Sequence, residues 1–137
     1  MQEQNPNVNN KVTGSNNYFS LISLNINGLN SPIKRPRLTE WICKQDPTFC
    51  CIQETHLSVE DRHYLRAKGW KTTFQANGLK KQAGVAILIS KTIDFQPKVI
   101  KKDKKGHLIL IRGKIFQDEL SILNIYTLNA RAVTFIK

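Results

Sequence analysis

The sequence of 137 residues has little acidic charge, few cysteines and no long apolar run. Its 10 Asp and Glu residues stand against 21 Lys and Arg residues, which gives a formal net charge of +11. No apolar run approaches the roughly 20 residues that a membrane-spanning helix needs, so we expect no membrane segment. Residues 1–17 are rich in Asn and Gln and lack the apolar core of a secretion signal. These absences predict a location in the nucleus or the cytoplasm.

The three cysteines, Cys43, Cys50 and Cys51, exclude two further classes of protein. An odd number without a C-x-x-C pair argues against a disulfide framework and against a zinc site. Cys50 and Cys51 are neighbours in an apolar run, so in a strand their side chains point to opposite faces. We expect them to be small buried apolar groups in a reducing compartment.

The excess of positive charge favours a polyanionic partner, and nucleic acid is the first candidate. Charge alone does not decide, because ribosomal, chromatin and membrane-surface proteins share it. Two lysine pairs, Lys101-Lys102 and Lys104-Lys105, flank Asp103 in a predicted turn. This turn is either a solvated hairpin tip or a contact with the DNA backbone.

Apolar patterns and turn signals predict one α/β or α+β domain over residues 18–137, preceded by a flexible polar tail over residues 1–17. Its sheet is predicted to be mixed and mainly antiparallel, with two helices. Residues 130–137 are predicted to begin a further helical segment. The predicted strands are Tyr18 to Ile26, Thr48 to Gln53, Trp70 to Gln75, Val85 to Ile89, Phe95 to Ile100, His107 to Ile115 and Leu120 to Tyr126.

The two predicted helices have recognisable starts. In the first, Ser31 is predicted as the N-cap before Pro32, and the helix proper is expected to begin near Pro36. The second covers Ser58 to Lys68, with Ser58 as the cap and Asp61 at the capping-box position.

Three polar clusters each follow an apolar run, at the point where a predicted strand ends. Polar groups at the carboxyl ends of neighbouring strands build sites in open α/β sheets. Glu54 is the strongest candidate, because Mg²⁺ is commonly bound by one or two carboxylates, waters and a substrate phosphate. The clusters are Asn25-Ile26-Asn27-Gly28, Gln53-Glu54-Thr55-His56 and Asn124-Ile125-Tyr126-Thr127-Leu128-Asn129.

Each polar residue has several open roles. Asn25 can orient Glu54, bind a phosphate oxygen or hold a water, and Asn129 can fix the phosphate or support Asn25. The Tyr126 phenol can donate to a developing oxyanion or help to activate water. Taken singly, each cluster also fits an ordinary turn or packing position. His56 and His63 show no ligand spacing and are predicted to be surface or structural residues.

The residues of these clusters and their order along the chain resemble the sequence motifs of the endonuclease/exonuclease/phosphatase superfamily. Within it, the sequence is similar to the N-terminal endonuclease domains of the second open-reading-frame proteins of LINE-one retrotransposons, which are also reverse transcriptase polyproteins. The resemblance runs from about Thr13 to Lys137. It is carried by Ser23 to Leu29, Ile33 to Arg35, Cys51 to Leu57, Lys68 to Trp70, Gln75 to Gly78, Ala83 to Leu88 and Ile122 to Asn129.

The resemblance implies a four-layer α/β sandwich, of which this chain would hold the N-terminal half. It implies that Glu54 and Asn25 bind Mg²⁺, with Mn²⁺ as a possible substitute, and that Tyr126 stabilises the transition state. Asn129 would complete the catalytic set, and Asn27, Thr55 and Asn129 would contact nucleic acid. Members of the family cut phosphodiesters by in-line attack of water. LINE-one enzymes nick AT-rich DNA so that its 3′-hydroxyl primes reverse transcription, with RNA as a partner of the full-length protein.

The sequence departs from the family pattern at three places. Thr127-Leu128 stands where the family has Ala-Pro, and Pro36 replaces a residue suited to a helix. The family's later Gly-Asp-Phe-Asn cluster, a further aspartate and an Asp-His pair have no counterpart, since no Asp follows Asp118. The chain alone is therefore expected to nick DNA poorly or not at all. An incomplete sandwich also predicts an uncovered apolar sheet face that favours aggregation.

Two other functions remain open at this point. The chain could be a non-enzymatic, basic nucleic-acid-binding relic of a LINE-type retrotransposon. It could also be a phosphatase of the same superfamily, although the basic charge and the LINE-like motifs weigh against that function.

Overall fold

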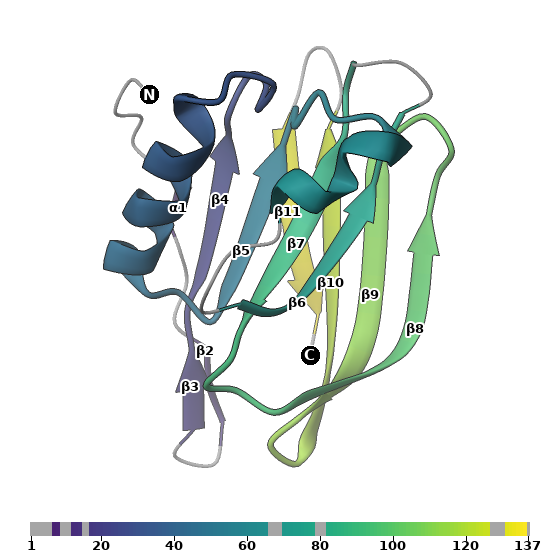
Figure 1. Cartoon of the computed structure of the whole chain (residues 1–137). Helices are drawn as coiled ribbons and strands as arrows, with labels where there is room; N and C mark the ends of the chain where they lie inside the picture. Colours follow the sequence, from purple (N-terminus) through teal and green to yellow (C-terminus); the bar gives the residue numbers. More distant parts are fainter. Residues whose placement is uncertain are drawn as a thin grey trace.

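In the computed structural model, which describes residues 7–8, 12–14, 17–65, 70–78, 82–126 and 131–136, two β-sheets face each other. The helical segments cover the outer side of the first sheet (Figure 1). This arrangement confirms the predicted α/β class. The helical segments and the two sheets form three layers of the predicted four-layer sandwich. No helix of the described residues is long and apolar enough to cross a membrane.

The first sheet is mixed, as predicted, with the strand order β1-β4-β5-β7-β6. Strands β4 and β5 are parallel, and the other pairs are antiparallel. Parallel pairing is important for the site because it brings the carboxyl ends of β4 and β5 side by side. The strands are β1 (Asn7–Val8), β4 (Leu21–Asn25), β5 (Phe49–Gln53), β6 (Trp70–Ala76) and β7 (Val85–Ser90).

The second sheet is antiparallel throughout, with the order β11-β10-β9-β8. Its strands are β8 (Phe95–Lys102), β9 (Leu108–Ile115), β10 (Asp118–Tyr126) and β11 (Arg131–Ile136). A separate two-stranded ribbon joins β2 (Val12–Gly14) to β3 (Asn17–Phe19). Strands β1 and β2 lie within residues 1–17, for which a flexible tail was predicted.

Helix α1 (Lys34–Gln45) begins before Pro36, which lies in its first turn. Proline is tolerated there because the first backbone N–H groups of a helix have no partner within the helix. The prediction of Ser31 as the N-cap is wrong: Ile33 occupies that position without a side-chain cap. Asp46 ends the helix in the left-handed conformation, with its N–H donating to the Ile42 carbonyl at 3.0 Å.

The second helical segment, η1 (Val59–Leu65), is a 3₁₀-helix, and the last three residues of the predicted helix, 66–68, lie outside the described residues. Its predicted cap is confirmed. The Ser58 N–H and hydroxyl both donate to Oδ2 of Asp61, at 3.3 and 2.8 Å.

Two hydrophobic cores lie on the two sides of the first sheet. Strand β5 is buried at every position and contributes to both cores. Cys51 faces the core between the sheets and Cys50 faces the core under α1 and η1, so the predicted opposite, buried positions are confirmed. In the first of these cores, the Phe49 ring packs edge-on against Phe19 and Phe95, with centroids 5.4 and 5.7 Å apart.

Two expectations about the later part of the chain are wrong. Residues 131–136 form a strand rather than the start of a helix, because they pair with β10 from Ser121↔Ile136 to Tyr126↔Arg131. The inner face of the first sheet is also not uncovered. Strands β8, β9 and β10 place Phe95, Ile109, Ile111 and Ile122 against it.

Candidate active site

The carboxyl ends of β4, β5 and β10 meet at one end of the sandwich. Past the last paired strand residues, the β4 and β5 chains stay joined. The N–H groups of Ile26, Gly28 and Leu29 donate to the carbonyls of Gln53, Glu54 and Thr55 at 3.1, 2.7 and 2.9 Å. The polar residues that follow β4 and β5 therefore sit on loops with a fixed mutual position.

A buried side-chain pair holds β10 in register with β5. Nε2 of Gln53 donates to Oδ1 of Asn124 at 2.9 Å, and both side chains are almost completely buried. Nδ2 of Asn124 donates to the carbonyls of Ile52 and Ala86 at 3.1 and 2.9 Å. Gln53 also donates to Oγ of Ser23 at 3.1 Å. We call this group the inter-sheet clamp; it fixes β10 relative to the first sheet.

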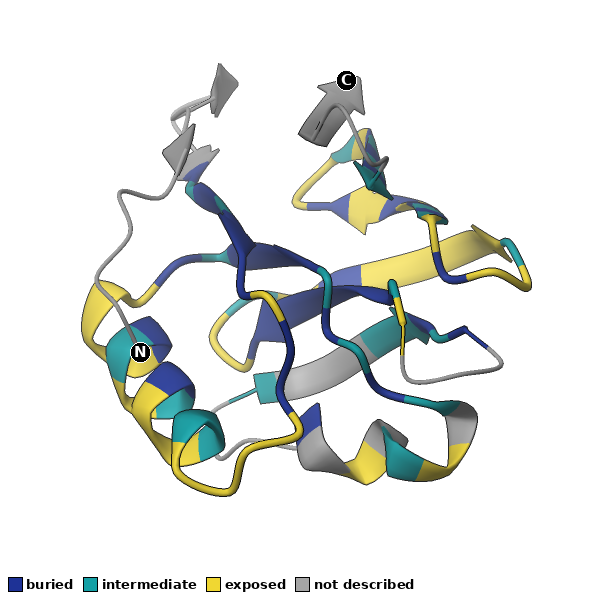
Figure 2. Cartoon of the chain, turned by 90° about the horizontal axis from the view of Figure 1, so that it is seen from above, coloured by how far each residue is buried: buried dark blue, intermediate teal, exposed yellow. Residues whose placement is uncertain are grey.

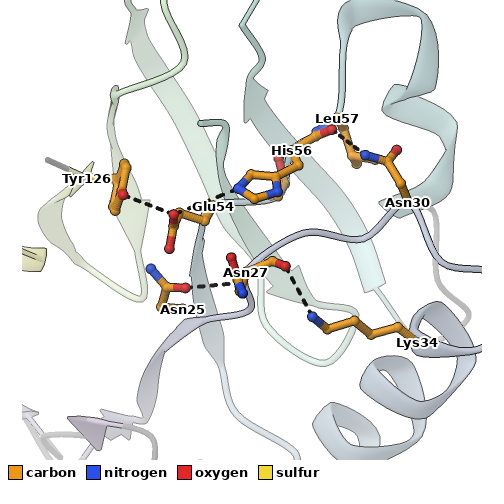
Figure 3. Close-up of polar contacts among 9 residues, drawn as sticks. Asn25, Asn27, Asn30, Lys34, Glu54, His56, Leu57 and Tyr126 are labelled. Carbon is orange, nitrogen blue, oxygen red and sulfur yellow. Dashed lines mark hydrogen bonds and ion pairs between the residues drawn. The ribbon is translucent and has the colours of Figure 1, made fainter. Parts of the chain in front are cut away.

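Glu54 and Tyr126 come together one and two residues beyond the clamp. The Tyr126 hydroxyl donates to Oε1 of Glu54 at 2.9 Å, although the two residues are 72 positions apart (Figure 3). Nε2 of His56 lies 3.7 Å from the same oxygen. The Glu54 side chain retains 22% of its exposure, so the carboxylate is accessible from solvent.

Asn25 faces the same carboxylate from the end of β4. Its Oδ1 accepts the Asn27 N–H at 3.1 Å, which turns Nδ2 toward Glu54 (Figure 3). Nδ2 is buried and makes no hydrogen bond of standard geometry. A buried donor without a partner is costly in a folded protein. The Asn25 amide therefore has a donor available for an anionic ligand.

The charge state of Glu54 follows from these neighbours. Burial by itself would raise the pKa of the Glu54 carboxyl. The Asn25 amide, the Tyr126 hydroxyl and the His56 imidazole together outweigh burial and hold the pKa below its ordinary value. Glu54 is therefore a carboxylate at neutral pH.

The loops of the site contain several residues in the left-handed backbone region. Asn27, Glu54 and His56 have φ values of 49°, 56° and 57°. Such conformations cost non-glycine residues roughly 1–2 kcal/mol each, and they concentrate at functional sites. Gly28 has a φ of 95°, and an added Cβ there would lie 2.7 Å from Nδ1 of His56. The His56 imidazole can therefore occupy its position beside Glu54 only because residue 28 is a glycine.

The structure brings together Asn25, Glu54 and Tyr126, as the sequence predicted. Asn27 lies beside them, exposed, with its carbonyl accepting from Nζ of Lys34 at 3.2 Å. Asn129 lies outside the described residues, so its predicted role stays a prediction.

Two residues of the Gln53-Glu54-Thr55-His56 cluster differ from expectation. Thr55, predicted to contact nucleic acid, is fully buried, and its Oγ1 accepts the Leu57 N–H at 3.4 Å. It supports the loop instead. His56, predicted as a surface or structural residue, points its ring at Glu54. The signal in the sequence was its position two residues after the acid.

The donor set fits a hard cation such as Mg²⁺ better than a transition metal. Within the residues the structure describes, no group of three or more His, Cys, Asp or Glu residues could hold a metal ion. The charged, accessible Glu54 carboxylate suits Mg²⁺, which keeps several waters and needs few protein ligands. Asn25 turns its amide nitrogen toward Glu54, and that nitrogen is not a ligand for a cation.

The two facing sheets, and the carboxylate, amide and phenol at their strand ends, define an α/β sandwich of the nuclease and phosphatase type. The model of the Endonuclease/Exonuclease/phosphatase family matches residues 22–130. The chain belongs to this family.

Solved structures share the fold. The catalytic domain of Xenopus laevis APE2 superposes with a TM-score of 0.62 and 19% identity over 77% of this chain and 44% of that chain. The AP endonuclease LMAP from Leishmania major gives 0.61 and 15% over 77% and 39%. Truncated TDP2 from Caenorhabditis elegans gives 0.59 and 20% over 79% and 45%. The chain thus spans less than half the length of each of these structures.

Proposed function

We propose that this chain carries the metal and phosphate site of a DNA endonuclease that hydrolyses phosphodiester bonds. The main support is the 2.9 Å hydrogen bond from Tyr126 to Glu54. It joins residues from two sheets at the point where both strands end, beside the buried amide nitrogen of Asn25. The carboxylate is charged and accessible, so it is available to a cation that itself meets a phosphate.

In this proposal, Glu54 would hold Mg²⁺, or Mn²⁺ in its place, with Asn25 beside it. A bound divalent ion would neutralise negative charge on the phosphate as the bond to the leaving oxygen breaks. The affinity is expected to be modest, because a single carboxylate supplies most of the protein's charge at the site.

The side chains around the carboxylate have separate tasks. Nδ2 of Asn25 faces the Glu54 carboxylate without a hydrogen bond of standard geometry, and in the complex it donates to a phosphate oxygen. Tyr126 and His56 keep the Glu54 carboxylate oriented and charged from the side of Oε1. Asn27, which is exposed, contacts the phosphate or the nucleic acid, and Asn129 keeps the role that the family resemblance implies.

Within the family, we propose the role of a LINE-type retrotransposon endonuclease. Its substrate would be AT-rich target DNA, and the 3′-hydroxyl of the nick would prime reverse transcription by the full-length protein, with RNA as template. The similarity of the segments Ser23 to Leu29 and Cys51 to Leu57 to the LINE-one motifs supports this role. A location in the nucleus or the cytoplasm is part of the same proposal.

A second function, binding of nucleic acid without cleavage, is favoured by one observation. Among the described residues, Glu54 is the only carboxylate with a recorded contact in the site. Efficient hydrolysis needs a positioned base for the attacking water as well as charge stabilisation. We therefore expect the isolated chain to nick DNA slowly, if the first proposal holds, and to bind it without nicking if the second does.

A nicking assay on supercoiled plasmid with Mg²⁺ separates the two. The test variant is Glu54→Gln, which removes the charge and keeps the shape. The matched control is Glu40→Gln on the exposed side of α1, where the carboxylate pairs with Lys44. Nicking that is lost in Glu54→Gln and kept in Glu40→Gln supports the endonuclease.

Salt-sensitive DNA binding by all three proteins, without nicking by any, supports the binding function instead. Nicking that survives Glu54→Gln unchanged overturns the assignment of Glu54. The LINE-type role has its own readout, because nicks should concentrate in AT-rich sequence and their ends should be extended by a DNA polymerase.

A further inference from the structure

The β8–β9 hairpin carries a concentration of lysines that the candidate active site does not use. Strand β8 is the edge strand of the second sheet and is exposed at seven of its eight positions (Figure 2). The turn that follows it adds two more exposed lysines. We call the whole group the β8 lysines: Lys98, Lys101, Lys102, Lys104 and Lys105.

Nearby acids do not neutralise most of this charge. Lys98 pairs with Glu119 at 3.2 Å, and Lys102 donates to the neutral carbonyl of Gln75 at 3.2 Å. For Lys101, Lys104 and Lys105, the structure records no ion pair with any residue that it describes.

The acid in the turn has another task. Oδ1 of Asp103 accepts the backbone N–H groups of His107 and Leu108 at 2.8 and 3.0 Å. Asp103 therefore shapes the turn, so that Lys104 and Lys105 project from a fixed backbone.

The turn is attached directly to the loops of the candidate active site. The Gly84 N–H donates to the Gly106 carbonyl at 2.8 Å, and the Thr55 N–H donates to the Gly84 carbonyl at 3.1 Å. On the other side, the Tyr126 N–H donates to the His107 carbonyl at 2.8 Å. The turn that carries Lys104 and Lys105 is thus linked to the backbone of Tyr126 by one hydrogen bond and to the backbone of Thr55 by two in succession.

Gly106 makes this close attachment possible. Its φ is 77°, and an added Cβ would lie 2.8 Å from the Gly78 nitrogen and 2.9 Å from the Gly84 nitrogen. The hairpin tip is therefore held against the site loop at a fixed position.

Protection of a sheet edge accounts for only part of the lysine group. Charged side chains on an edge strand discourage pairing with other chains. This reason applies to Lys98, Lys101 and Lys102, which lie on β8. It does not apply to Lys104 and Lys105, which lie beyond the strand, in the turn nearest the candidate active site.

We propose that Lys101, Lys104 and Lys105 bind the phosphate backbone of the nucleic acid whose cleaved bond lies at Glu54. The identity of the polyanion rests on the proposed function; the position of the surface rests on the hydrogen bonds above. A strand rises about 3.3 Å per residue, so eight residues span ~26 Å. Phosphates on one DNA strand follow at about 3.4 Å along the axis, so β8 is long enough to follow several of them.

The test measures binding of a labelled DNA duplex by fluorescence anisotropy, in EDTA and over a range of salt concentrations. The test protein is the triple variant Lys101→Gln, Lys104→Gln, Lys105→Gln. The matched control is Arg37→Gln, Lys44→Gln, Lys91→Gln, which removes the same charge from α1 and from the β7–β8 turn at the opposite end of the sheet. All six side chains are exposed, so both triples should fold normally.

The slope of log K against log salt should fall by about 1 for each phosphate that the protein no longer neutralises, and thus by about 2 to 3 in the test triple. Its affinity at low salt should fall at least ~10-fold. The control should keep the slope of the unmodified chain. Equal losses of affinity in both triples, or an unchanged affinity in the test triple, would overturn the proposal.

Two further measurements separate this inference from the proposed function. Nicking by Glu54→Gln, measured with Mg²⁺, reports on the proposed function, and duplex binding by the test triple, measured in EDTA, reports on this inference. If neither the unmodified chain nor any variant nicks DNA, but the test triple binds the duplex more weakly than the unmodified chain, the role of the lysines stands and the endonuclease assignment fails. If the test triple loses binding to vesicles of anionic lipid but keeps DNA binding, the surface faces a membrane and the inference is wrong.

Discussion

Two polar pairs connect the end of β5 with the end of β10, and they differ in what they leave unsatisfied. In the inter-sheet clamp, Gln53 and Asn124 are buried, and the recorded hydrogen bonds use the side-chain oxygen and both side-chain N–H donors of Asn124. In the second pair, Glu54 and Tyr126 share one hydrogen bond and remain partly exposed, beside a buried donor of Asn25 without a partner.

The difference separates folding from function within a few residues of chain. A fully satisfied buried network specifies one arrangement of the two sheets. A pair that keeps charge, exposure and spare hydrogen-bonding capacity is available to a ligand. The clamp thus fixes the geometry in which Tyr126 reaches Glu54, and the second pair supplies the chemistry.

Of the two pairs, the inter-sheet clamp should contribute more to the free energy of unfolding. In Asn124→Ala, the carbonyls of Ile52 and Ala86 lose their recorded side-chain donor, and a small cavity appears. Unsatisfied buried groups and cavities predict a loss of about 3 kcal/mol, measured by urea unfolding. Asn30→Ala is the control, because its exposed amide makes one hydrogen bond, to the His56 carbonyl. It should cost under about 1 kcal/mol, and equal losses in the two variants would contradict the role of the clamp.

The second pair should affect activity more than stability. In Tyr126→Phe, Glu54 loses a hydrogen bond to its charged form, while the ring stays in place. Hydrogen bonds to charged groups are worth about 1.5–3 kcal/mol, so any Mg²⁺-dependent nicking should fall ~10-fold or more. In the free protein the pair is partly exposed, so water replaces the lost hydrogen bond and the free energy of unfolding should change by under about 1 kcal/mol. A variant that unfolds as easily as Asn124→Ala would remove the distinction between the pairs.

The pH dependence of the site sharpens the same contrast. Glu54 has a pKa below its ordinary value of 4.5, so its stabilising contribution is complete above that pH and is lost as the pH falls through the folded value. Loss of Mg²⁺ binding, followed by calorimetry, should therefore occur at a lower pH than expected for a glutamate with the ordinary pKa of 4.5. In Tyr126→Phe, the loss of binding should begin at a higher pH. Binding that already weakens near pH 6 in the unmodified chain would contradict the lowered pKa.

The smallest expected effect is on the reactivity of the cysteine thiols, because two of them are buried in the cores on either side of β5. Burial raises the pKa of Cys50 to about 12, and burial with the neighbouring Cys50 raises that of Cys51 well above its usual value. Cys43 is exposed. Ellman's reagent should therefore label one thiol rapidly in the folded chain and three after unfolding. Rapid labelling of more than one thiol in the folded chain would show that β5 is accessible.

Local sequence patterns predicted the parts of the fold that depend on neighbouring residues. Alternating and continuous apolar runs located β5, β7, β9 and β10, and the Ser58–Asp61 cap was visible from its spacing. The convergence of Glu54 and Tyr126 was predicted from motif order. The polar positions at strand ends carried that information.

The remaining features depend on contacts between distant residues. The clamp joins positions 71 residues apart, so nothing in either segment marks Asn124 as a structural amide. The strand at residues 131–136 was missed because its pairing with β10 determines its conformation. The role of His56 was missed because left-handed backbone at Glu54 and His56 turns the ring back to the acid.

That left-handed backbone has a consequence for anyone who redesigns the protein. Replacing Glu54 or His56 with glycine would relieve the conformational strain, and a screen that rewards heat resistance alone would favour such changes. The most thermostable descendants of this chain would then be ones that had lost the acid or its imidazole neighbour. Laboratory evolution of this domain should therefore keep positions 54 and 56 fixed while stabilising changes are sought in the two cores.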